Sequence, residues 1–332
     1  MLCCIAWLFV LFMFWGVVVS FSSWSYWGAW LGMELTTMFF IPYLSQSKMY
    51  LFGYTLWEYF VVQALGSSVF ILGMVSMPQV GIMHYVDMGS VFGLLSVGAI
   101  LLKLGMPPFH WWSLIFCEFL GWKEFWMFSS LVKLAPMAIL LNYVAVYGGT
   151  VVVMLQTLML LLGVQGSIDL SIRRILIYSS MVSLMWVIAG VMVSLPSSIV
   201  LLLSYMTILA CVCAKFHSSN VYSLLSITRL FSSMSSLGVF IWLVLIWSLM
   251  GFPPSIMFMV KLDILTMLWS SVSPYLTLFL AFLGIVMLVG YLNLMSKAII
   301  SIDGYTPSYQ QHVFYSCYVI IILATLTMLW VY

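Results

Sequence analysis

Long apolar runs joined by short polar stretches are the feature that most limits how this chain can fold. Of its 332 residues, 65% are hydrophobic and only 5% are charged, and the mean hydropathy is +1.21, whereas a soluble domain has about 25% charged residues. Lipid cannot satisfy backbone donors and acceptors, so such runs cross a bilayer as helices of about 20 residues. The sequence therefore predicts an all-α polytopic membrane protein with room for roughly ten to twelve spans.

About eleven helical spans are expected from the hydropathy pattern. They cover roughly 2–21, 26–44, 57–76, 88–120, 124–144, 150–166, 171–195, 197–214, 236–270, 275–296 and 313–331. No Lys or Arg precedes Lys48, so residues 1–21 lack the basic flank of a signal or transit peptide, and we expect them to form the first span. A more polar segment rich in serine, about 215–234, precedes the ninth span.

The basic residues of the loops all fall on one side of this arrangement. The loops on the side of the N-terminus contain Lys48, Lys123, Arg173, Arg174, Lys215, Arg229 and Lys297. The positive-inside rule makes that side the cytoplasmic or matrix side. We therefore expect the N-terminus there and, after an odd number of spans, the C-terminus on the opposite side.

Two of the expected spans are over-long, and each contains a Gly/Pro break. The breaks contain Gly105, Pro107, Pro108, Gly251, Pro253 and Pro254. Adjacent prolines remove two backbone donors and clash with the preceding turn, and broken backbone at membrane depth persists only where it is buried in protein or lines a wet cavity. Paired broken helices indicate a transporter built from inverted repeats. We expect a single domain with approximate halves 1–145 and 146–332.

Four ionisable side chains lie well inside the expected spans: Glu34, Lys103, Lys133 and Lys261. At about 3 kcal/mol each they cost on the order of 10 kcal/mol unless they are paired or hydrated. Lys103 stands beside the first break and indicates an ion path, although a lysine that snorkels from a helix end fits the same spacing. Glu34 and Lys103 fit either a structural salt bridge or a pair that switches.

The remaining two lysines have no obvious acid within the spans. Burial disfavours the charged form of an amine, so Lys133 is a candidate proton carrier near neutral pH. Lys261 follows the second break, where freed carbonyls and water can solvate it. Asp263 lies two residues further on, and residues at that spacing do not share a helix face. His110, just past the first break, is either a proton relay or a partner for a freed carbonyl.

Motifs for cofactors and metals are absent from the sequence. No CxxC pair or zinc or iron–sulfur spacing is present among the cysteines, no GxGxxG follows a strand pattern, and there is no GxxxxGK[ST]. We therefore expect no metal, nucleotide or redox centre in this chain. The formal net charge of +2 gives no indication of a nucleic-acid partner.

Five segments resemble, in order along the chain, subunit 2 of mitochondrial NADH–ubiquinone oxidoreductase, respiratory complex I. They are LGMELTTMFFIP around Glu34, LLKLGMPPFHWW at 101–112, VKLAPMAIL at 132–140, IRRILIYSSMVSLMWVI at 172–188 and LMGFPPSIMFMVK at 249–261. Pro107 stands where that family has alanine. Leu262 and Asp263 follow Lys261 where the family has tryptophan, so Asp263 is expected to alter the proton affinity of Lys261.

The resemblance implies an antiporter-like fold with two inverted bundles and two broken helices, lacking three N-terminal helices of the bacterial form. It assigns the acid and lysine pair to Glu34 and Lys103, the central lysine to Lys133 and the exit-side lysine to Lys261. It implies a multi-pass protein of the mitochondrial inner membrane with its N-terminus in the matrix and its C-terminus in the intermembrane space.

The implied function is proton translocation in the membrane arm, driven by quinone reduction elsewhere in the complex. NADH, FMN, iron–sulfur clusters and ubiquinone would be bound by other subunits. The implied partners are neighbouring antiporter-like and small channel subunits and lipids such as cardiolipin. A subunit of a cation/proton antiporter is the alternative, since it shares the broken helices and lysines, but the missing N-terminal helices favour complex I. The retained charges argue against a scaffold with an inactive channel.

Overall fold

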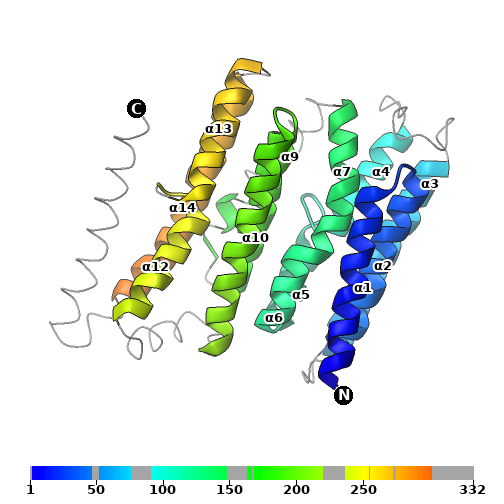
Figure 1. Cartoon of the computed structure of the whole chain (residues 1–332), viewed down its shortest axis with the longest axis horizontal. Helices are drawn as coiled ribbons and strands as arrows, with labels where there is room; N and C mark the ends of the chain where they lie inside the picture. The colour runs from blue at the N-terminus through cyan, green and yellow to red at the C-terminus, as the bar shows by residue number, and fades with distance from the viewer. Residues whose placement is uncertain are drawn as a thin grey trace. The chain divides into compact units, whose positions relative to one another are not determined.

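The structure is a computed structural model that describes residues 2–46, 52–75, 91–147, 163–166, 168–169, 171–219, 236–253, 255–271 and 274–300 (Figure 1). The regular elements in these ranges are all helical, as predicted. The expected span at 313–331, most of the expected span at 150–166 and most of the serine-rich segment lie outside the described residues. The chain divides into two compact units, Met1–Leu158 and Met159–Tyr332.

The first unit is a bundle of helices that run side by side. Its elements are α1 (Leu2–Ser22), α2 (Tyr26–Ser45), α3 (Phe52–Val75), α4 (Val91–Leu104), α5 (Trp111–Phe119), α6 (Trp122–Met127), the π-helical segment η1 (Phe128–Val132) and α7 (Lys133–Tyr147). The predicted fifth span is thus one continuous helical stretch whose middle turn is widened to π-helix.

The second unit is also helical. Its elements are α9 (Ile172–Val191), α10 (Leu195–Ser218), α12 (Ser236–Met250), α13 (Ile256–Ser271) and α14 (Pro274–Ile300). Helix α9 packs against α10, α13 and α14, and nearly all of its residues are buried. Its buried serine hydroxyls donate to carbonyls three residues earlier, as Ser180 does to Ile177 O at 2.7 Å. Such local bonds allow a serine-containing helix to form the centre of an apolar bundle.

Five helices of the described residues are long and apolar enough to cross a membrane. They are Gly53–Val75, Trp122–Asn142, Ile172–Val191, Leu195–Ser218 and Pro274–Leu292. Shorter apolar helices cover Ala6–Ser22, Leu95–Leu104 and Ile241–Met250. Large apolar side chains such as Trp15 and Leu72 are exposed on the outside of the chain, as expected where lipid or another subunit covers the surface.

Helices α1 and α2 approach each other closely at two glycines, and this contact fixes the helix that carries Glu34. A Cβ atom on Gly32 would lie 2.6 Å from the Ser20 backbone nitrogen, and one on Gly16 would lie 2.9 Å from the Gly32 oxygen. Small residues of this kind let membrane helices pack backbone to backbone. Side chains at these positions would therefore push α2 away from α1.

The first predicted break ends α4 in a Schellman motif. Gly105 has a φ of 64°, its N–H donates to Leu102 O at 3.1 Å, and the Met106 N–H donates to Leu101 O at 2.9 Å. Only glycine adopts this left-handed conformation without strain. Pro107 and Pro108 follow in the connection to α5, as expected for residues that cannot continue a helix.

The second break repeats this geometry at the end of α12. Gly251 has a φ of 75°, its N–H donates to Ser248 O at 3.2 Å, and the Phe252 N–H donates to Trp247 O at 3.3 Å. Pro253 lies in the connection to α13, and Pro254 lies outside the described residues. The two over-long spans are therefore interrupted by the same backbone motif, as the paired Gly/Pro breaks predicted.

Candidate functional site

Glu34 on α2 and Lys103 on α4 form an ion pair beside the first break. Lys103 Nζ lies 2.5 Å from Glu34 Oε1, and the side chains are 1% and 19% exposed, respectively. Lys103 is in the last turn of α4, two residues before Gly105. The alternative in which Lys103 extends to the membrane surface is wrong, because its side chain is buried and turned toward the carboxylate.

Helix α3 makes room for this lysine and satisfies the backbone that the break exposes. A Cβ atom on Gly66 would lie 2.7 Å from Lys103 Cγ, so the lysine stem occupies the space that glycine leaves. Gln63 Nε2 donates to Lys103 O at 3.3 Å, and Trp112 Nε1 donates to Leu102 O at 3.1 Å. The carbonyls at the end of α4 therefore have side-chain donors, as buried carbonyls require.

Gln63 was not among the residues that the sequence singled out. It is buried, and it is the only amide side chain in the apolar stretch 57–76. A lone amide in a membrane span is expensive unless it has partners, and this signal could have identified it.

An aromatic cluster lies next to the pair and extends to η1. The Tyr59 ring stacks on Phe116 with centroids 5.0 Å apart, and Phe116 meets Phe128 edge to face at 5.1 Å. Phe40, from α2, contacts Tyr59 at 5.6 Å. These rings place apolar surface beside the pair, and charges interact more strongly in a medium of low dielectric.

Lys133 begins α7 directly after the π-helical segment. Its side chain is buried, and Nζ lies 5.8 Å from the centroid of the Phe128 ring. Pro136 cannot donate to the carbonyl of Val132, the last residue of η1. Insertion of a π turn before a proline relieves this conflict, and such turns are frequent at functional sites. Helix α7 packs against α2 and α4, the helices of the ion pair.

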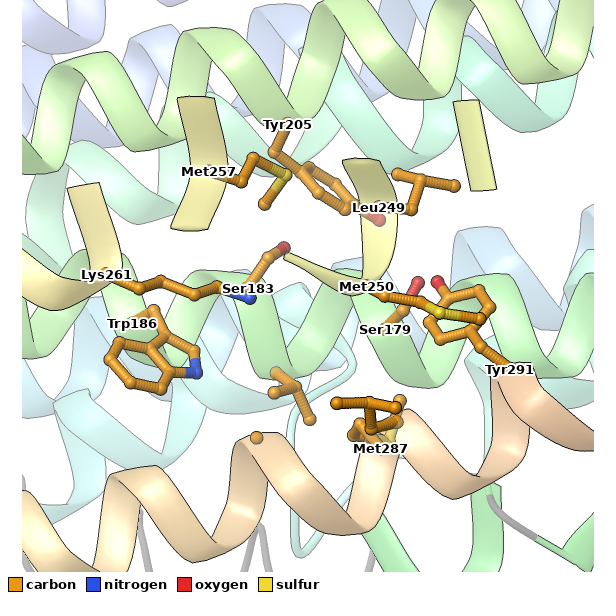
Figure 2. A pocket seen from close by; sticks show the side chains of 13 residues that line it. Ser179, Ser183, Trp186, Tyr205, Leu249, Met250, Met257, Lys261, Met287 and Tyr291 are labelled. Atoms are coloured by element: carbon orange, nitrogen blue, oxygen red, sulfur yellow. The ribbon is translucent and has the colours of Figure 1, made fainter. Parts of the chain in front are cut away.

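Lys261 on α13 turns back toward the second break. A Cβ atom on Gly251 would lie 2.9 Å from Lys261 Nζ, so the amine sits against the backbone of the break. Nζ also lies 5.5 Å from the centroid of the Trp186 ring of α9, within the range of a cation–π interaction. The amine lines a polar cavity together with Ser183 and Tyr205 (Figure 2).

Asp263 and Lys261 lie on different faces of α13, as predicted. Asp263 is exposed, whereas Lys261 lines the internal cavity. The two side chains therefore face different surroundings, and no direct contact supports the expected effect of Asp263 on the proton affinity of Lys261.

His110 lies at the first break and precedes α5. Its carbonyl accepts hydrogen bonds from the Ser113 N–H at 3.2 Å and from the Ser113 hydroxyl at 2.7 Å. Its half-buried ring lies 6.1 Å from the Trp111 ring. The backbone of His110 thus anchors the first turn of α5, and its role as a relay stays a prediction.

Comparison with known proteins gives a consistent family. No family model matches the chain. The NADH-ubiquinone oxidoreductase chain 2 of Lumbricus terrestris is 30% identical over 283 residues, which are 84% of this chain and 82% of the relative. The proteins of the same name from Locusta migratoria and Mus musculus are 24% and 25% identical, over 87% and 85% of this chain and 84% and 82% of the relatives.

Solved structures share the fold at lower sequence identity. A chain of respiratory complex I from Thermus thermophilus with bound Aureothin superposes with a TM-score of 0.72 at 17% identity, covering 98% of this chain and 79% of that chain. A chain of the Mrp complex from Dietzia sp. gives 0.71 at 17% identity, covering 86% and 59%. The fold, the broken helices with their buried charges and the relative at 30% identity agree: the chain belongs to the NADH-ubiquinone oxidoreductase chain 2 family.

Proposed function

We propose that this chain translocates protons in the membrane arm of respiratory complex I, NADH:ubiquinone oxidoreductase, in the mitochondrial inner membrane. The observation that carries the proposal is the ion pair between buried Lys103 and half-buried Glu34 beside a broken helix, in a chain of this family. Ionisable residues inside membrane spans are rare, and they mark proton and ion paths.

The pair acts as an electrostatic switch in this proposal. Two unit charges 4 Å apart interact by about 4 kcal/mol at an effective dielectric near 20. Movement of Glu34 toward or away from Lys103 changes the local potential by an amount of this order. Such a change is large enough to load or empty a buried lysine, since about 1.4 kcal/mol corresponds to a tenfold change in proton affinity.

Lys133 and Lys261 are the proposed proton carriers. Lys133 belongs to the same unit as the pair, on a helix that packs against both α2 and α4, so its proton affinity responds to the charge state of the pair. Lys261, beside the second break, is the proposed exit-side carrier. His110 is a candidate relay near the first break.

The redox chemistry belongs to other subunits in this proposal. NADH, FMN, iron–sulfur clusters and ubiquinone are bound elsewhere in the complex, and this chain contributes only proton transfer. Its partners are neighbouring antiporter-like and small channel subunits, with lipids such as cardiolipin at the surface. The N-terminus faces the matrix and the C-terminus the intermembrane space, because the basic loop residues gather on the side of the N-terminus.

A subunit of a cation/proton antiporter remains the second candidate, because the Mrp complex shares the fold. A native gel separates the two. Comigration of this chain with NADH dehydrogenase activity supports the complex I assignment, and migration in a complex without that activity supports the antiporter.

The switch is tested by a double-mutant cycle on proton pumping. Glu34→Gln and Lys103→Met are each introduced into the assembled complex, which is placed in vesicles so that pumping and NADH oxidation can both be followed. Each change should reduce protons pumped per NADH oxidised, and the double variant should lose less than the sum of the single losses. Strict additivity would show that the two residues do not act together.

A further inference from the structure

A small polar cavity lies beside Lys261 inside the second unit (Figure 2). Its volume is about 30 Å³, and helices α9, α10, α12, α13 and α14 all contribute to its wall. A cavity of this size holds about two water molecules if polar groups line it. The polar groups in its wall are Ser179, Ser183, Trp186, Tyr205, Lys261 and Tyr291.

The serine hydroxyls in this wall already donate their protons to backbone carbonyls. Ser179 donates to Leu176 O at 2.8 Å, and Ser183 donates to Ser180 O at 2.8 Å. A hydroxyl whose proton is engaged still has a lone pair that accepts. The α9 side of the cavity therefore presents acceptors.

Three buried donors complete the wall, and none of them makes a hydrogen bond of good geometry to a described residue. They are the Trp186 indole N–H and the Tyr205 and Tyr291 hydroxyls. Both tyrosine hydroxyls interact with Ser179 at the limit of hydrogen-bond geometry, and Figure 2 shows Tyr291 at the end of the cavity away from Lys261. Buried polar groups are almost always satisfied, so the unpaired Trp186 N–H and the weakly held tyrosine hydroxyls favour a small ligand that both donates and accepts.

We propose that the cavity binds water and that this water connects the Lys261 amine to Tyr205 and Tyr291 as the next step of a proton path. The lining residues include no carboxylate, and the neighbouring lysine repels metal cations, so a neutral ligand fits best. The inference rests on the proposed function of Lys261 and extends it by naming the residues that receive its proton.

Each oxygen along the path accepts one proton and releases another, so its protonation state is the same before and after the transfer. An N–H bond of the Lys261 ammonium breaks and leaves a neutral amine, while the cavity water accepts that proton at oxygen and passes on another. A tyrosine hydroxyl accepts this proton at its oxygen and releases its own to the next acceptor. Ser179 and Ser183 act as positioning residues, because their oxygens orient the water.

Hydroxyl-radical footprinting of the intact complex tests for the water directly. Radicals formed from bound water oxidise methionines beside it, and Met250, Met257 and Met287 line the cavity. They should be oxidised faster than Met33 and Met185, which are fully buried but do not line it. Equal, slow oxidation of all five would overturn the proposal.

Gly284→Ala tests the function of the water, because it fills the cavity and removes no polar group. The new Cβ would lie 3.6 Å from Trp186 Cζ2, an ordinary contact, and alanine suits a helix better than glycine. Pumping per NADH oxidised should fall, and oxidation of the three methionines should slow. Gly98→Ala is the matched control, because its Cβ meets nothing within 4 Å. Normal pumping by Gly284→Ala would contradict the proposal.

Tyr291→Phe provides a second variant that keeps the packing and removes only the hydroxyl. Tyr291→Phe should lower the rate of pumping and increase the solvent deuterium isotope effect on that rate. Tyr178 is buried on α9 outside the cavity, so the control Tyr178→Phe should change neither quantity. Lys261→Met distinguishes failure of the proposed function from failure of the water path. Normal pumping by Lys261→Met would overturn the proposed function, whereas loss of pumping there with normal Tyr291→Phe and Gly284→Ala would overturn only the water path.

Discussion

The two helix breaks share one backbone motif but hold their lysines in opposite ways. At the first break Lys103 precedes the glycine and is neutralised by Glu34 from another helix. At the second, Lys261 follows the glycine by ten positions, and its amine meets the Gly251 backbone, the Trp186 ring and a cavity of hydroxyl groups. No carboxylate pairs with Lys261 among the described residues.

This difference suits the two lysines to different tasks. A lysine with a fixed acid partner is stabilised by it, and the pair responds as a unit when the distance between the charges changes. A lysine surrounded by neutral dipoles and water can gain or lose its proton without leaving an uncompensated acid. The repeated break therefore supplies freed backbone in both units, while the side chains around it decide between a switch and a carrier.

Lysine-to-methionine variants at the two breaks should separate these tasks most strongly. Lys103→Met leaves the half-buried Glu34 carboxylate without its partner, and an unpaired charge that is partly removed from water destabilises the fold. Assembly of the complex on native gels should therefore fall. Lys261→Met leaves no such charge, so the complex should assemble and fail to pump. Addition of Glu34→Gln to Lys103→Met should restore assembly, and equal assembly of the two single variants would contradict the comparison.

Lys133 offers a third environment, because it follows a π turn and not a Gly/Pro break. Lys133→Met keeps length and apolarity but cannot hold a proton, so the assembled complex should lose most of its pumping. Lys133→Arg should fail similarly, because arginine stays protonated. Pumping and NADH oxidation measured in the same vesicles check this. Normal pumping by the assembled methionine variant would show that Lys133 is not a carrier.

Alanine in place of the two glycines should have similar effects on stability and different effects on function. Both glycines have a positive φ, so each change should destabilise by about 1–2 kcal/mol, measured as thermal loss of the assembled complex. The added Cβ displaces the Lys261 amine in Gly251→Ala but meets Ser113 in Gly105→Ala. The second-break variant should therefore lose more pumping per assembled complex, and equal loss would count against a role for this contact.

The smallest effect is expected at Asp263. This carboxylate is exposed on α13 while Lys261 faces the cavity, so Asp263→Asn should leave the pH dependence of pumping almost unchanged. If Asp263→Asn shifted the pH dependence of pumping as much as the cavity variant Tyr291→Phe does, Asp263 would act on Lys261 through space.

The sequence alone was sufficient for the fold class, the two breaks and the buried charges. Apolar runs leave a membrane chain no option but helices, Gly/Pro pairs end a helix wherever they occur, and a charge in an apolar run is conspicuous. These are local properties, and within the described residues the helices and both breaks lie close to where the pattern put them, whereas the number of eleven spans stays a prediction.

Tertiary structure decided which groups meet. Glu34 and Lys103 are 69 positions apart in sequence, and Gln63 and Gly66 support the lysine from a third helix. The sequence singled out both Lys261 and Asp263, but only the packing of α13 shows which one faces inward. Hydropathy predicts how apolar a helix is but not how it is rotated about its axis. The cavity beside Lys261 is formed by five helices, so only their packing reveals it.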